Sequence, residues 1–178
     1  MIPKIKNILY ATDLSKNSAY AFRYAINSAL HHDADIHILH VLEIPMVPFF
    51  PPAEGTGTVY EGQLYLEKLQ EFDSEQKKLA KEKIQKRLKD FCQQELESNS
   101  DLLKRVVSIE IAEGDPAAQI LQKAEELPVD LVIMGTHGKG LLAHAFLGSV
   151  AEKVLHRIRI PVFIIPIPEK TDIGFSRV

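Results

Sequence analysis

The sequence has little of what marks secreted, membrane-spanning or disulfide-stapled proteins. It contains one cysteine, Cys92, and no tryptophan. A single thiol cannot form an internal disulfide and is easily kept reduced, which is typical of a cytoplasmic protein. No apolar run approaches the roughly 18–20 residues that cross a bilayer. The apolar stretch of residues 8–11 stops at Asp13 and is too short for a signal peptide. We therefore expect a soluble cytoplasmic protein with no membrane partner.

An excess of charge of one sign is also missing. The 21 basic and 24 acidic residues give a net charge of −3, and the isoelectric point is about 6.2. Such a chain has no strong attraction for nucleic acid or for an anionic membrane. Apolar residues make up 46% of the 178 residues and charged residues 25%, close to the globular average. We expect one domain over residues 1–168 and a flexible polar tail over residues 169–178.

Apolar periodicity indicates strands and helices in alternation. Runs rich in β-branched and apolar residues predict five strands, at residues 5–11, 35–42, 106–112, 131–134 and 162–165. Apolar spacings of three and four predict four helices, at residues 17–30, 64–97, 116–127 and 148–159. The third helix follows Asp115-Pro116, a capping residue with proline at the first helical position. This alternation implies right-handed crossovers and a mostly parallel sheet, an α/β fold.

Residues 44–62 lie outside this pattern. The segment is dense in proline and glycine, so we expect neither a helix nor a central strand there. It follows the strand predicted at residues 35–42 and would serve as a lid over a ligand, as a surface loop or as a partner-binding segment. The helix predicted at residues 64–97 is unusually long, and a break near Asp73-Ser74 would shorten it.

The most informative stretch is a pair of glycine-rich segments. Gly135-Thr136-His137-Gly138 is followed, after nine residues, by Gly148-Ser149-Val150. The first segment begins where a predicted strand ends, and the second lies where the last predicted helix begins. Glycines let the backbone approach phosphate oxygens, and a helix start offers unpaired N–H groups to an anion. Ser149 adds a hydroxyl donor and Lys139 a cation, so the pattern favours a phosphate-binding site.

Other readings of these glycines fit less well. A P-loop requires lysine after its last glycine, whereas Leu141 follows Gly140. Gly138-x-Gly140-x-x-Ala143 matches a loose dinucleotide fingerprint, but Ile160 occupies the position expected for a ribose-binding acid. A purely structural role in a tight strand-to-helix connection stays open. The seven histidines form no metal-ligand pattern, and no serine lies in a nucleophile elbow.

Together with Ala11-Thr12-Asp13, the glycine pattern resembles the universal stress protein family, in its ATP-binding branch. The similarity spans residues 4–167. It implies an open five-stranded parallel sheet of order 3-2-1-4-5 with helices on both faces, a Rossmann-like fold similar to the adenine nucleotide α-hydrolases. It also implies a homodimer, and the apolar edge strand Val162–Ile165 is suited to pairing with a second copy. Ligands of such sheets bind where the strand order reverses, at the carboxyl ends of the strands.

The resemblance also implies roles for individual residues. Asp13 would bind the nucleoside through its side chain, although a helix cap is an alternative role for it. Val41 would meet adenine through backbone groups, and the glycine segments would line ribose and phosphates. His137 would touch phosphate or simply be solvated. The complete set of candidate ligand residues is Thr12, Asp13, Val41, Met134, Gly135, His137, Gly138, Lys139, Gly148, Ser149 and Val150.

Three functions are compatible with these residues. The favoured one is an ATP-dependent sensor or regulator in a stress response, with weak or no hydrolysis, because no general base accompanies the glycines. The second is an enzyme of the same topology that hydrolyses ATP or transfers an adenylyl group. The third is a dimeric scaffold that binds no nucleotide. Bound ATP would carry Mg²⁺ held mainly by its phosphates, since Lys139 is the only obvious cation in the pattern.

Overall fold

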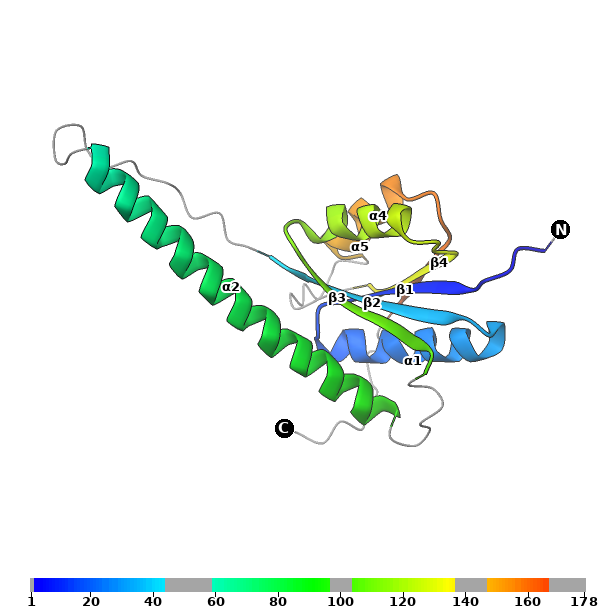
Figure 1. Ribbon diagram of the computed structural model, residues 1–178. Helices are drawn as coiled ribbons and strands as arrows, with labels where there is room; N and C mark the ends of the chain where they lie inside the picture. Colours follow the sequence, from blue (N-terminus) through cyan, green and yellow to red (C-terminus); the bar gives the residue numbers. More distant parts are fainter. Residues whose placement is uncertain (1, 44–58, 97–103, 137–146, 167–178) are drawn as a thin grey trace.

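The computed structural model describes residues 2–43, 59–96, 104–136 and 147–166. It contains one five-stranded sheet in the order β3-β2-β1-β4-β5, and every strand pair is parallel (Figure 1). The predicted fold class and strand order are therefore confirmed. The elements are β1 (Asn7–Thr12), α1 (Lys16–His32), β2 (Asp35–Leu42), α2 (Val59–Leu96), β3 (Val106–Glu113), α4 (Pro116–Glu126), β4 (Leu131–Gly135), α5 (Ser149–Arg157) and β5 (Val162–Ile165).

Helices cover both faces of the sheet and create two apolar cores. Successive side chains of a strand point to opposite faces, so β1 serves both cores. Ile8 and Tyr10 pack with α1 and α2, whereas Leu9 and Ala11 pack with α4 and α5. Figure 1 shows the same layers, with α4 and α5 above the sheet and α1 below it. Burial on both faces explains why the central strands read as continuous apolar runs.

The helix starts follow local sequence signals. Asp115 caps α4 by accepting a hydrogen bond from the Ala118 backbone N–H at 2.9 Å, with Pro116 in the first turn, as predicted. Ser15 caps α1, and its side chain accepts from the Ser18 backbone N–H at 3.2 Å. These side-chain acceptors satisfy N–H groups that the first helical turn leaves unpaired.

Helix α2 corrects two predictions. It runs unbroken over 38 residues, so the break expected near Asp73-Ser74 is wrong. It also begins at Val59, so residues 59–62 are helical although the proline- and glycine-rich segment was expected to extend to residue 62. The last proline of that segment is Pro52, and the single Gly62 costs only about 1 kcal/mol in a helix. The remainder of that segment, residues 44–58, lies outside the described residues.

The carboxyl-terminal part of α2 packs against the sheet. Leu88 is fully buried and Cys92 is 3% exposed, with Ile84 packed beside them against the α1-side core. Figure 1 shows the opposite end of α2 extending away from the other elements. Leu79, on the same helix, is 49% exposed.

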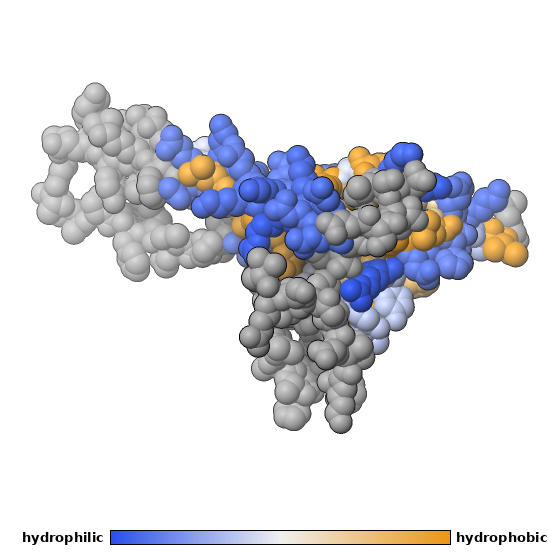
Figure 2. Space-filling model, turned by 90° about the horizontal axis from the view of Figure 1, so that it is seen from below, coloured by the Kyte–Doolittle hydropathy of each residue, from blue (hydrophilic) through white to orange (hydrophobic). Residues whose placement is uncertain are grey.

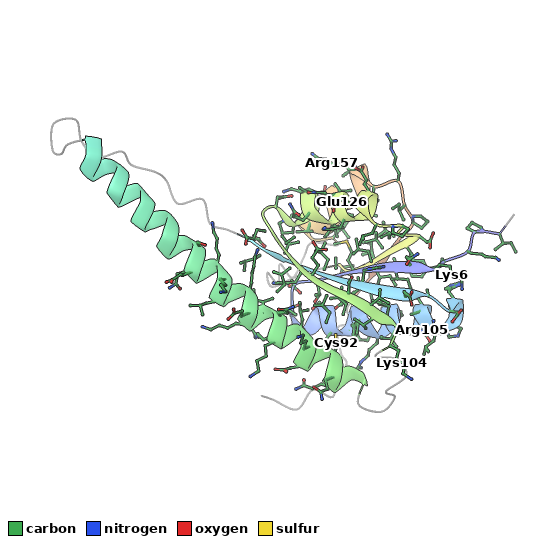
Figure 3. The ribbon with its side chains drawn as sticks, viewed as in Figure 1. Lys6, Cys92, Lys104, Arg105, Glu126 and Arg157 are labelled. Carbon is green, nitrogen blue, oxygen red and sulfur yellow. The ribbon has the colours of Figure 1, made fainter. Side chains whose placement is uncertain are left out.

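Ion pairs fasten the rim at the amino ends of the strands. Asp33 pairs with Lys6, before β1, and with Arg105, before β3. Figure 3 labels both basic residues. The Arg105 guanidinium, followed by Lys6, lowers the pKa of the Asp33 carboxyl. Asp130 Oδ2 accepts from the backbone N–H groups of Lys6 and Asn7 at 2.8 and 2.9 Å. Side chains therefore tie the amino ends of these strands together.

Seen from below, the described surface is largely hydrophilic, and apolar residues form small separate areas (Figure 2). On α1, Tyr24 and Leu30 are 42% and 51% exposed. Within the described residues, no helix is both long and apolar enough to cross a membrane.

Candidate functional site

The candidate site lies where β1 and β4 end side by side. From this pair the chain order runs outward in opposite directions, to β2 and β3 on one side and to β5 on the other. From β1 the chain enters α1 on one face of the sheet, and α5 packs on the other face. Such a reversal opens a crevice at the carboxyl ends of the strands. Asp13 directly follows β1, and Gly135 is the last residue of β4.

A backbone hydrogen bond brings α5 to the same place. The Gly148 N–H donates to the Thr136 carbonyl at 2.7 Å, so the start of α5 lies beside the end of β4. Gly148 is the N-cap residue of α5 and makes no side-chain capping bond. Since glycine has no side chain, Gly148 leaves the first-turn N–H groups, which include those of Ser149 and Val150, without a cap of its own. Such a helix start is suited to an anion.

Asp13 has one oxygen in use and one without a partner. Its Oδ1 accepts from the Ser15 backbone N–H at 3.0 Å, closing a turn between β1 and α1. Its Oδ2 is buried, and no group among the described residues donates a hydrogen bond to it. Because Ser15 is the N-cap of α1, the alternative in which Asp13 caps this helix is wrong. An unsatisfied buried acceptor costs roughly 1–3 kcal/mol, so this oxygen needs a donor from outside the described chain.

The turn after β1 is constrained by its neighbours. Leu14 has a φ of 61°, a left-handed conformation that is uncommon outside glycine and asparagine. Its N–H donates to Thr12 Oγ1 at 3.1 Å, and this hydroxyl donates to Ser18 Oγ at 2.9 Å. The Thr12 side chain is 7% exposed. The Thr12 hydroxyl is therefore engaged in bonds within the turn.

The remaining candidates differ in where they lie. Val41 lies near the end of β2 and packs partly buried on the α4 side, opposite Ala112 of β3. Met134 is 6% exposed, and its side chain belongs to the same core. Gly135 pairs with Ile165 of β5. His137, Gly138 and Lys139 lie outside the described residues.

Two histidines of β2 lie on opposite faces of the sheet, as predicted. His37 Nδ1 is 2.8 Å from Ser108 Oγ on β3. His40 is 4% exposed, and its Nδ1 donates to the Thr12 carbonyl at 2.7 Å. Within the described residues, no group of three His, Cys, Asp or Glu side chains is placed to hold a metal ion. The carboxyl ends of β1 and β4 thus carry an acceptor, Asp13 Oδ2, and N–H donors at the start of α5, a pairing suited to a ligand with hydroxyl groups and an anionic group.

Residues 4–166 match the universal stress protein family. The chain belongs to this family. Universal stress protein MJ0531 of Methanocaldococcus jannaschii is 34% identical over 166 residues, which cover 93% of this chain and 84% of that relative. The solved structure of MJ0577, a universal stress protein of the same organism, has a TM-score of 0.71 and 25% identity, covering 94% of this chain and all of the other. Another universal stress protein, solved in complex with cAMP, shares the fold with a TM-score of 0.57 and 19% identity, covering 92% and 98%.

Sequence reasoning missed three residues that shape the candidate site of this universal stress protein. Ser15, Ser18 and His40 support the β1–α1 turn, yet none was a candidate. Ser15 carried a usable signal, because a serine before an apolar-periodic segment is a preferred N-cap. The contact of His40 with β1 depends on the register that pairs it with Thr12. No local sequence pattern predicts that contact.

Proposed function

We propose that this universal stress protein binds ATP in the crevice between β1 and β4. It would act as a nucleotide-dependent sensor or regulator in a stress response, with weak or no hydrolysis. The unpartnered Oδ2 of Asp13 carries this proposal. A ribose hydroxyl is a donor that would satisfy this oxygen, while the uncapped start of α5 would receive phosphate. The lone, buried Cys92 suits a reducing cytoplasm, the proposed compartment.

The proposed contacts divide between the two sides of the crevice. Asp13 would bind ribose, and Val41 would bind adenine through its backbone. The phosphates would meet the start of α5 and the connection that follows β4, with Lys139 as a cation. Mg²⁺ would be bound mainly by phosphate and water oxygens. The further members of the proposed site are Thr12, Met134, Gly135, His137, Gly138, Gly148, Ser149 and Val150.

Calorimetry with MgATP tests the proposal directly. We expect saturable binding of one ATP per chain, and intact adenine nucleotide in the supernatant when freshly purified protein is denatured and analysed by chromatography. Titration with cAMP tests whether the ligand seen in one family member also binds here. If the preparation contains no bound nucleotide and ATP produces no heat of binding, the dimeric scaffold becomes the better interpretation. Steady phosphate release would instead support the hydrolytic alternative.

We further propose that the protein forms a homodimer through β5. This strand is at one edge of the sheet, and Phe163 on it is 44% exposed. An apolar edge with unpaired backbone groups is suited to pairing with a second copy across a two-fold axis. Phe163→Lys should lower the mass measured by light scattering from dimer to monomer. Leu30→Lys, at an exposed position on α1, is the control and should stay dimeric. A monomeric wild type at high concentration would contradict the dimer.

A further inference from the structure

A buried chain of hydrogen bonds runs through the turn between β1 and α1. The Leu14 N–H donates to Thr12 Oγ1, this hydroxyl donates to Ser18 Oγ, and the Ser18 hydroxyl donates to the Ser15 carbonyl at 2.8 Å. Thr12 and Ser18 are 7% and 4% exposed. Each hydroxyl is both acceptor and donor, so the bonds polarise and strengthen one another in a medium of low dielectric constant.

Two further side chains tie this chain of hydrogen bonds to the sheet. His40 of β2 donates from Nδ1 to the Thr12 carbonyl. The Tyr10 hydroxyl donates to the Ser18 carbonyl. Burial raises the pKa of Tyr10, so the phenol remains a donor throughout the neutral range. The turn is thus fixed by β1, β2 and α1 together.

The residues that this network holds are the two neighbours of Asp13. Thr12 is held through its carbonyl and its hydroxyl, and Leu14 is held through its N–H in a left-handed conformation. Asp13 lies between them and accepts from the Ser15 N–H through Oδ1. None of the network's hydroxyl bonds involves Oδ2. The network therefore fixes the backbone on both sides of Asp13, and no described residue donates to Oδ2.

We propose that Thr12, Ser18 and His40 are positioning residues for the nucleotide site, and that they act through Asp13. The inference rests on the proposed ATP binding. It adds a supporting role to the place proposed for Thr12 in the site, because the Thr12 hydroxyl already donates to Ser18 and accepts from Leu14 within the turn. A ligand-binding acceptor held rigidly in this way loses little conformational freedom when the ligand arrives.

Paired substitutions at Thr12 separate positioning from general stability. Thr12→Val keeps the shape and removes the hydroxyl, whereas Thr12→Ser keeps the hydroxyl. We expect Thr12→Val to weaken ATP binding about tenfold in calorimetry, the loss of one hydrogen bond, and Thr12→Ser to restore it. The matched control is Ser108→Ala, which removes a half-buried hydroxyl bonded to His37 at 2.8 Å on β3. This control should lower the melting temperature without changing the ATP affinity.

Hydrogen exchange provides a second, local measurement. In Thr12→Val the amides of Leu14 and Ser15 should exchange faster, while amides of β4 keep their protection. Ser18→Ala, which removes the middle of the hydroxyl chain, should act in the same direction and serves if Thr12→Val does not fold. Wild-type ATP affinity in a folded Thr12→Val or Ser18→Ala variant overturns the positioning role alone. A wild type that binds no ATP overturns the proposed function and this inference with it.

Discussion

Asp13→Asn separates the proposed ligand-binding role of Asp13 from its structural role. The amide oxygen of asparagine can still accept from the Ser15 N–H, so the turn after β1 should persist. The other atom changes from the unpartnered carboxylate oxygen to an amide nitrogen, which donates and cannot accept. The substitution therefore removes one acceptor and its charge while keeping the size of the side chain.

The two expected effects have opposite signs. A hydrogen bond to a charged group contributes about 1.5–3 kcal/mol, so losing the ribose contact should weaken ATP binding roughly 10- to 150-fold. Without ligand, the wild type buries a carboxylate oxygen that lacks a donor, whereas the variant buries a neutral amide that is cheaper to remove from water. We expect the free energy of unfolding of the ligand-free variant to equal that of the wild type or to exceed it by up to about 1 kcal/mol.

Calorimetry with MgATP and urea denaturation without ligand measure the two quantities on the same preparations. Asp33→Asn is the matched control, because it makes the same change in an exposed carboxylate at the opposite rim, where both oxygens have ionic partners. The control should bind ATP like the wild type. Undiminished ATP affinity in Asp13→Asn would refute the assignment of Oδ2 as a ligand acceptor. A large loss of stability in the ligand-free variant would show that the carboxylate is needed by the fold itself.

Three other expectations test the fold. Because its ion pairs lower the pKa of Asp33, the stability that these pairs add should be present at neutral pH and lost as the pH falls below the ordinary value of 3.8. In urea unfolding at several pH values, the wild type and Asp33→Asn should differ at pH 7 and converge in acid. A difference that persists in acid would contradict this expectation. Leu88→Ala should lower the free energy of unfolding by about 2–5 kcal/mol in the same assay. Leu79→Ala, on the exposed side of α2, should change this free energy by less than about 0.5 kcal/mol. Equal losses in the two variants would contradict the packing of α2. Burial raises the pKa of the Cys92 thiol from 9.0 to about 11. At pH 8 this thiol should therefore react with a disulfide reagent only after the protein unfolds. Rapid reaction of the native protein would contradict this and would show that this end of α2 opens.

The regular elements were predictable because local and global preferences agree in them. The strands predicted at residues 35–42 and 162–165 have the observed bounds, since turn-forming or proline residues flank apolar, β-branched runs. The first strand was placed two residues early, because Ile5 is apolar but precedes the ladder that starts with Asn7. Helix α2 was misjudged at its start, where composition suggested a loop. Without proline after Pro52, nothing in residues 59–62 prevents helix formation.

The place where the candidate residues meet was predictable from topology, but the geometry of the turn that holds Asp13 was not. The strand order alone brings Asp13 and Gly135 to one crevice. The free oxygen of Asp13 and the cap by Ser15 depend on how the turn closes. A positive φ at Leu14 contradicts the local preference of leucine, so only the tertiary network could reveal it.

The β1–α1 turn combines two features that disfavour the folded state when no ligand is bound. A left-handed conformation costs roughly 1–2 kcal/mol in a residue with a side chain, and Leu14 adopts it. The unpartnered Oδ2 of Asp13 adds a cost of similar size. Glycine in place of Leu14 and a small polar residue in place of Asp13 would remove both costs and still permit a turn. The buried network around Thr12 instead holds this unfavourable arrangement in place.

Such local strain, supported by rigid surroundings, is characteristic of binding sites whose geometry is set before the ligand arrives. If the proposed nucleotide binds at Asp13, part of its binding free energy would come from satisfying an acceptor that the fold already keeps away from water.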